Sequence, residues 1–199
     1  MILLPLFSST HMRFFYLLQT GFWSPLPFHD VIQQMEEHSK KLLQLGWKVV
    51  RMKCETTPVT TVGRVNCPIE NVDAANYPPT NYFEFHVKIQ LFFDDVYDIR
   101  LATLKDLTLK HHGHLSKNAF KSFSDQEHRF VTFRCYHLGL KAASAKVDIF
   151  VDDVLSHHLS ILQVQREYAV WDTNVDHDSG WIVQTAERDG PNIQLRARL

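Results

Sequence analysis

Three polar side chains share one face of the segment 82–89, whose sequence is Tyr-Phe-Glu-Phe-His-Val-Lys-Ile. Successive side chains of a β-strand point to opposite faces, so Glu84, His86 and Lys88 lie in one row and the apolar residues lie in the other. A carboxylate, an imidazole and an ammonium in one row can hold an anionic ligand and exchange a proton with it near neutral pH. This row is the first candidate for a functional surface.

A second segment with this alternation places His114, Ser116 and Asn118 on one face. The same parity adds Arg134 and Glu167 from two later strand-like segments. If these segments form one sheet, their polar residues make one continuous surface. We interpret it as a ligand site. A plain solvated face, or a face covered by a partner, is the alternative, because an open sheet face is polar by default.

The chemistry of these side chains predicts distinct roles. Lys88 and Arg134 bind an anionic group, Arg by a planar two-pronged contact and Lys as a point charge. Ser116 and Asn118 orient the ligand. The predicted catalytic side chains are two imidazoles that act as acid and base and two carboxylates that tune them, namely His86, His114, Glu84 and Glu167.

Signatures of other chemistries are missing from the sequence. There is no G-x-S-x-G motif, and no Gly-rich phosphate loop follows any predicted strand of this chain, which has only seven glycines. The runs 111–114 and 176–178 contain His and Asp but lack the H-E-x-x-H spacing that puts two metal ligands on one helical face. We therefore predict neither a cofactor nor a metal ion.

One short motif supports phosphoester chemistry. The segment His158-Leu159-Ser160-Ile161 resembles the His-x-Ser/Thr-hydrophobic motif of two-histidine phosphoesterases, which use paired β-α-β lobes. The segment 114–116 resembles a partial second copy, in which Lys117 replaces the hydrophobic residue. The resemblance covers only these residues, and it implies hydrolysis of a phosphoester.

Hydrophobic periodicity predicts the elements that position these residues. An N-terminal β-α-β module comprises a strand at 13–20, a helix at 28–45 and a strand at 47–55. A long loop rich in Pro and Thr follows at 56–81. The later elements are strand 82–91, helix 96–111, strand 114–120, strand 129–137, helix 140–157 and strand 159–171. This order predicts an α+β fold with a ferredoxin-like β-α-β-β-α-β antiparallel sheet, the additional N-terminal β-α-β module, and helices on one face.

Composition sets the broader limits. A chain of 199 residues that is 45% hydrophobic can form one α+β domain, which we place at 13–185 between a loose N-terminal extension, 1–12, and a tail, 186–199. Three cysteines without a C-x-x-C pair fit a reducing, cytoplasmic location. No run of about 18 apolar residues predicts a membrane span, so we expect no membrane partner. The loop 56–81 is expected to be mobile and to lie beside the polar surface.

The predicted function is recognition of a small anionic molecule, carrying phosphate or carboxylate, with acid/base turnover by a hydrolase or lyase. The alternatives are a non-catalytic module that binds single-stranded RNA and an interaction protein whose open face contacts another subunit, including a homo-oligomer. RNA would stack on aromatic residues of the open face, namely Tyr82, Phe130, Tyr136 and Trp171. The net charge of −1 and the isoelectric point near 6.9 weigh against general affinity for a nucleic-acid backbone.

Overall fold

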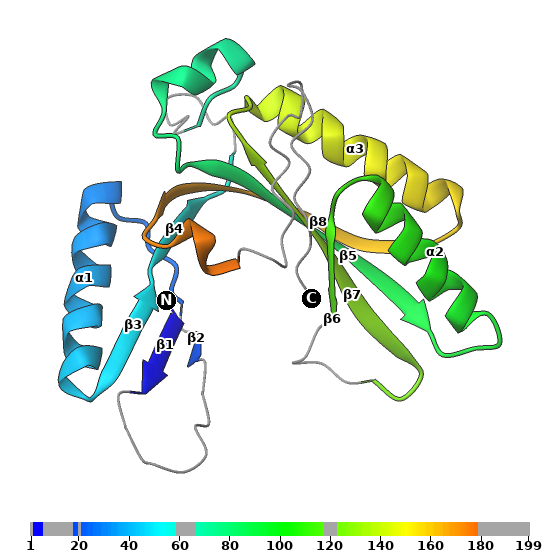
Figure 1. The fold of residues 1–199 in the computed structure, drawn as a ribbon, viewed down its shortest axis with the longest axis horizontal. Coiled ribbons are helices and arrows are strands. Elements are labelled where there is room, and N and C mark those ends of the chain that lie inside the picture. The colour runs from blue at the N-terminus through cyan, green and yellow to red at the C-terminus, as the bar shows by residue number, and fades with distance from the viewer. Residues whose placement is uncertain (1, 6–17, 20, 59–66, 118–122, 179–199) are drawn as a thin grey trace, which may run out of the picture.

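The computed structural model describes residues 2–5, 18–19, 21–58, 67–117 and 123–178. This part of the chain has an α+β fold that contains a five-stranded antiparallel sheet with the order β4-β8-β5-β7-β6 (Figure 1). The strands are β4 (Lys53–Thr56), β5 (Tyr82–Phe92), β6 (His114–Lys117), β7 (Gln126–Tyr136) and β8 (Ser160–Asp172). The two helices that pack on this sheet are α2 (Tyr97–Lys110) and α3 (Leu140–Ser156).

The hydrophobic core lies between these helices and one face of the sheet. Phe83, Phe85 and Val87 of β5 are fully buried there, and Phe133 of β7 packs edge-to-face against Phe150 of α3. The predicted parity of the central strands is therefore confirmed. The opposite face of the sheet, which we call the polar face, carries the even-numbered residues 82–90 of β5 and the residues paired with them in β7 and β8.

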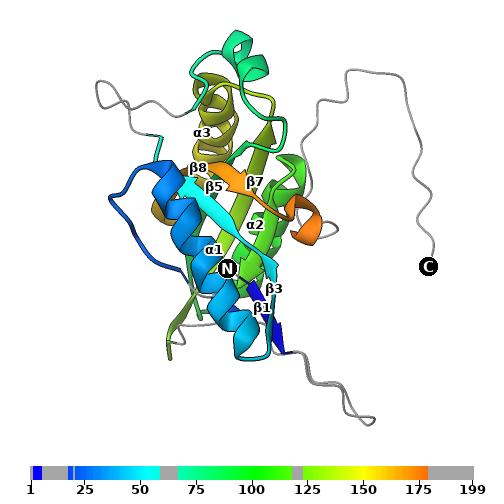
Figure 2. The same ribbon diagram turned by 90° about the vertical axis from the view of Figure 1, so that its left-hand side faces the viewer.

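The N-terminal part forms a second, three-stranded sheet with the order β2-β1-β3. Its strands are β1 (Ile2–Pro5), β2 (Leu18–Gln19) and β3 (Trp47–Arg51), and helix α1 (Phe28–Gln44) lies against β3 (Figure 2). Helix α1 ends before Gly46, whose φ of 82° is the left-handed conformation that glycine adopts without a steric cost.

Two N-terminal predictions need correction. The region 47–55 is not one strand, because Met52 separates β3 in the small sheet from β4 in the large one. The Met52 amide donates to Thr173 Oγ1 at 2.9 Å, and its carbonyl accepts from the Thr173 amide at 3.0 Å, so contacts with the end of β8 fix this break. The extension 1–12 is also not wholly loose, since Ile2–Pro5 pair with β3 as strand β1. Most of the predicted strand 13–20 falls outside the described residues.

The loop 56–81 was expected to be mobile and to lie beside the polar face. Its described part is instead packed against the hydrophobic core and the start of α3. Cys67 is buried in the core, and residues 71–76 form the short helix η1 (Asn71–Asn76). The carbonyls of Pro68 and Ile69 accept hydrogen bonds from the amides of Leu140 and Lys141, at 2.8 and 3.2 Å. These amides belong to the first turn of α3, where no helical carbonyl is within reach. The segment 59–66 lies outside the described residues.

Two further features complete the described chain. A short helix, η2 (Val175–Asp178), follows β8, and the predicted domain end at 185 and the tail 186–199 fall outside the described residues. His112, His137 and His158 have φ values of 57°, 56° and 58°, and they follow α2, β7 and α3 in turn. None of the helices in the described residues has both the length and the apolar character of a membrane span.

Candidate functional site

Two rows of side chains cross the polar face of the sheet. The first, the His86 row, runs from β6 to β8 through His114, Thr132, His86 and Gln165. The second, the Lys88 row, follows the same strands through Ser116, Phe130, Lys88 and Gln163. The two rows are two residues apart along each strand, a separation of about 7 Å.

His86 lies between a hydroxyl and two carboxylates. Its Nδ1 is 3.0 Å from Thr132 Oγ1, and its Nε2 is 3.5 Å from Glu167 and 3.9 Å from Glu84. The Nε2 distances exceed the 2.7–3.2 Å of a typical N–H···O hydrogen bond, so neither carboxylate holds this nitrogen tightly. The side chain is 28% exposed. The Nδ1 contact thus fixes the ring, and Nε2 remains able to form a close contact with a ligand.

The carboxylates beside His86 are held in their ionised form. Burial alone would raise the pKa of Glu84, but the charges of Lys53 and Arg134 outweigh burial and lower it. Glu167 behaves in the same way, since its contacts with His86 and Gln165 lower its pKa in spite of burial. The His86 ring is therefore next to two negative charges at neutral pH.

Arg134 is part of a buried ion network at the end of the polar face. Its Nη2 donates to Asp178 at 2.8 Å and to Glu84 at 3.3 Å, and its guanidinium carbon lies 4.5 Å from the centre of the Tyr82 ring. The side chain is only 2% exposed. Lys53 also belongs to this network, because its ammonium contacts both Glu55 and Glu84.

Arg51 connects this network to the small sheet. From β3 its guanidinium donates to Asp172 at 2.5 and 3.0 Å, to Asp178 at 2.6 Å and to the Tyr82 hydroxyl at 3.1 Å. Burial would raise the pKa of both aspartates, but hydrogen bonds from Arg51, and from Arg134 to Asp178, lower it. Arg51 thus pairs with both aspartates inside the protein and Arg134 pairs with Asp178, an arrangement typical of a structural support.

The structure brings together only part of the predicted site. Glu84 and Glu167 both lie within 4 Å of His86 Nε2. His114 is in the same row as His86, but Thr132 of β7 lies between them, so their backbones are two strand spacings, about 10 Å, apart. Burial lowers the pKa of His114, and the nearby charge of Asp178 reduces this shift.

The four predicted ligand-binding residues have different surroundings. Lys88 and Ser116 are half-buried in the Lys88 row. Arg134 is buried and paired with Glu84 and Asp178, so binding to a ligand would require a change in that network. Asn118 lies outside the described residues.

Sequence reasoning missed Arg51, Lys53 and Glu55 as neighbours of the site. These three residues alternate at every second position, as in the segment 82–88, and this signal was available. The alternating segment was assigned to one strand of the N-terminal module. Nothing local in the sequence shows that the chain passes from one sheet to the other at Met52. Asp172 and Asp178 stand out in the sequence only as polar residues after the last strand.

The two copies of the two-histidine motif do not share a site in the described residues. Strands β6 and β8 are separated in the sheet by β7 and β5. His114 lies on the polar face, whereas His158 is exposed in the turn between α3 and β8. The resemblance to two-histidine phosphoesterases is therefore not matched by the arrangement of these histidines.

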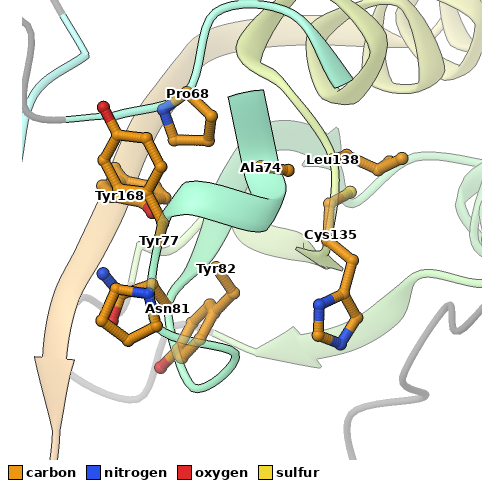
Figure 3. A pocket seen from close by; sticks show the side chains of 10 residues that line it. Pro68, Ala74, Tyr77, Asn81, Tyr82, Cys135, Leu138 and Tyr168 are labelled. Atoms are coloured by element: carbon orange, nitrogen blue, oxygen red, sulfur yellow. The ribbon is translucent and has the colours of Figure 1, made fainter. Parts of the chain in front are cut away.

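A small pocket lies at the other end of β5 from the Lys88 row (Figure 3). Tyr77, Asn81 and Tyr168 line it on one side, and Cys135 and Leu138 line it on the other. Its free volume is about 10 Å³, which is room for roughly one water molecule. This pocket is therefore too small to hold a metabolite.

Comparison with protein-family models, with curated proteins and with solved structures gave no significant match. In the described part of the chain, no three His, Cys, Asp or Glu side chains are grouped as ligands of one metal ion.

Proposed function

We propose that the polar face binds a small molecule with an anionic group, a phosphate or a carboxylate, and that His86 exchanges a proton with the bound molecule. The observation that carries this proposal is the position of Lys88, two residues along the same strand from a histidine whose ring is fixed and partly exposed. A cation and a proton-transfer group are then within reach of one ligand.

Lys88 differs from the other cations of this region. Arg51, Lys53 and Arg134 are each paired with carboxylates, whereas none of the described carboxylates forms an ion pair with Lys88. A ligand anion would supply that partner as a charge-assisted hydrogen bond. Ser116, in the same row, offers a hydroxyl that can donate to the ligand.

The two imidazoles suit opposite tasks in hydrolysis of a phosphoester. Burial favours the neutral form of His114, which can take a proton from an attacking water. The water oxygen forms the new bond to phosphorus, the ester P–O bond breaks, and the leaving oxygen takes a proton from His86. The backbones of the two histidines are about 10 Å apart, and the phosphate and the water would lie over Thr132 between them.

In this proposal the remaining predicted residues act as supports. Glu84 and Glu167 stabilise positive charge on His86, and Arg134 keeps Glu84 ionised.

We further propose that strands β8-β5-β7-β6, with α2 and α3 on one face, are a ferredoxin-like unit, and that the N-terminal elements are an added module. The strand order and the antiparallel pairing support this assignment.

The first test compares ligand binding in wild type and in a Lys88→Ala variant. Inorganic phosphate, ribose 5-phosphate and citrate serve as probes, since a ligand at 100 times its Kd stabilises a protein by about 2.7 kcal/mol in a thermal-shift assay. We expect Lys88→Ala to raise Kd by about 10- to 150-fold, which corresponds to 1.5 to 3 kcal/mol. Lys105→Ala, at an exposed site on α2, is the control and should bind as wild type does. Equal binding by wild type and Lys88→Ala would exclude this site.

The second part of this test concerns turnover of a phosphate ester that binds. We expect His86→Gln to reduce phosphate release by about 10²-fold with a smaller effect on affinity, because an acid/base group acts mainly on the barrier. His29→Gln, on α1, is the matched control. Stabilisation by short single-stranded RNA but by none of the small anions would instead favour the RNA-binding alternative.

A further inference from the structure

An aromatic ring lies in the Lys88 row. Phe130 is half-buried on the polar face, paired with Ser116 on one side and Lys88 on the other, and it is not part of the hydrophobic core beneath the helices. A Phe side chain that projects from a sheet toward the polar side presents an apolar, polarisable surface. Such a surface binds the flat face of another ring.

Lys88 and Phe130 are close enough to contact the same ligand. The Lys88 ammonium is 6.0 Å from the centre of the Phe130 ring, at the outer limit of a cation–π contact. This weak contact places the cation over the ring without neutralising its charge. A molecule stacked on Phe130 would therefore place an anionic substituent within reach of Lys88.

The neighbouring residues suit the hydroxyl groups of a sugar. Gln163 and Gln165 are exposed in the two rows, and each amide can both donate and accept hydrogen bonds. Ser116 adds a hydroxyl on the other side of Phe130. The surface thus presents a ring platform, neutral polar groups and a cation, and His86 lies in the adjacent row.

We propose that the ligand of the polar face is a nucleoside monophosphate, with its base stacked on Phe130 and its phosphate beside Lys88 and His86. This inference rests on the proposed function and narrows it, because Lys88 and His86 alone would accept any small phosphate. Tyr82 and Tyr136 are paired at the Arg134 end of this face, where Tyr82 is buried under Arg134, so Phe130 is the aromatic platform beside Lys88.

The test is calorimetric titration of the full-length protein with AMP, ribose 5-phosphate and adenosine. Stacking of a base on an aromatic side chain should make AMP bind about tenfold more tightly than ribose 5-phosphate. Phe130→Leu, which keeps apolar bulk but removes the ring, should abolish that difference and leave the Kd of ribose 5-phosphate unchanged. Phe130→Tyr keeps the aromatic ring, so this variant should still bind AMP more tightly than ribose 5-phosphate.

Different failures have different meanings. Equal Kd values for AMP and ribose 5-phosphate in wild type, with both dependent on Lys88, would overturn this inference and leave the proposed function standing. A Phe130→Leu variant that is folded, as judged by its circular dichroism, and that loses affinity for both ligands equally would also overturn it. Failure of all three ligands would contradict the inference and the proposed function together. Phe93→Leu, at an exposed ring beyond β5, is the matched control and should behave as wild type.

Discussion

At the scale of single residues, the described chain keeps several carboxylates ionised inside the protein by surrounding them with donors. Glu127 of β7 is the clearest case. Its side chain is 4% exposed, and it accepts from the Tyr97 hydroxyl at 2.7 Å, from Arg129 Nε at 2.5 Å and from Lys117 Nζ at 2.8 Å. Burial would raise its pKa, but the three donors outweigh burial and hold the pKa at about 2. This carboxylate joins α2, β6 and β7.

The lowered pKa of Glu127 predicts how its contribution to stability depends on pH. The pKa of the folded form is below the unfolded value of 4.5, so the contribution is present above pH 4.5 and is lost as pH falls toward 2. At pH 7 we expect Glu127→Gln to lower the free energy of unfolding by on the order of 1.5 to 3 kcal/mol. Urea denaturation between pH 7 and 3 should show the difference from wild type shrinking as pH falls.

Glu36→Gln is the control for this measurement, because Glu36 is exposed on α1 and should have little effect at any pH. A difference between wild type and Glu127→Gln that stays constant over the whole pH range would contradict the prediction.

At the scale of elements, the start of α3 depends on a segment some 70 residues earlier in the chain. The Asn71 side chain accepts from the Gly139 amide at 2.8 Å, next to the two carbonyl contacts from Pro68 and Ile69. Gly139 has ordinary backbone angles, with φ of −79°, and glycine is needed there for a different reason. A Cβ at this position would be 2.3 Å from the Glu70 carbonyl carbon, so only hydrogen fits.

This close approach predicts that Gly139→Ala is destabilising. The added methyl would push the segment 68–71 away from α3 and weaken the hydrogen bonds to its first turn, at a cost of about 1 to 3 kcal/mol. Gly21→Ala is the matched control, since no atom lies within 4 Å of a Cβ at Gly21. Chemical denaturation of the two variants measures the difference. If both were equally stable, the packing of 68–71 on α3 would be wrong.

At the scale of the whole molecule, the two sheets are connected through buried charge. Arg51 leaves the small sheet and reaches Asp172 at the end of β8 and Asp178 in η2, both nearly inaccessible to solvent. Asn174 adds a side-chain hydrogen bond to the Val50 carbonyl at 3.1 Å. In the described residues, hydrogen bonds of Arg51 and Asn174 therefore fix the position of β3 relative to β8.

Loss of the Arg51 charge should destabilise the whole fold. We expect Arg51→Met to lower the free energy of unfolding by about 3 to 5 kcal/mol, because it leaves buried carboxylates without their main partner. Arg166→Met is the matched control. Arg166 pairs with Asp148 at the surface, and such pairs contribute about 0 to 1 kcal/mol. Guanidinium denaturation of both variants provides the comparison, and equal losses would show that Arg51 acts as an ordinary surface cation.

The sequence was sufficient for features that depend on local periodicity. Alternation in 82–89 identified the buried and polar faces of β5, and helical spacing located α1, α2 and α3 to within a residue or two. The sequence could not predict that the Arg134 side chain is buried. Alternation assigns a residue to one face of the sheet but does not show what packs on that face. The sequence also could not predict the contacts of Arg51 or of residues 68–71, because their partners lie 31 to 127 positions away.

The three histidines with positive φ have a consequence for the margin of stability. An L-residue with a Cβ holds the left-handed conformation at a cost of roughly 1 to 2 kcal/mol relative to glycine, and His112, His137 and His158 all do so. This strain lies in the turns after α2, β7 and α3 and not in the strand residues Lys88 and Phe130. The fold is therefore less stable than the same fold would be with glycine in these three turns. Replacement of these histidines by glycine could offset the loss of stability caused by substitutions on the polar face.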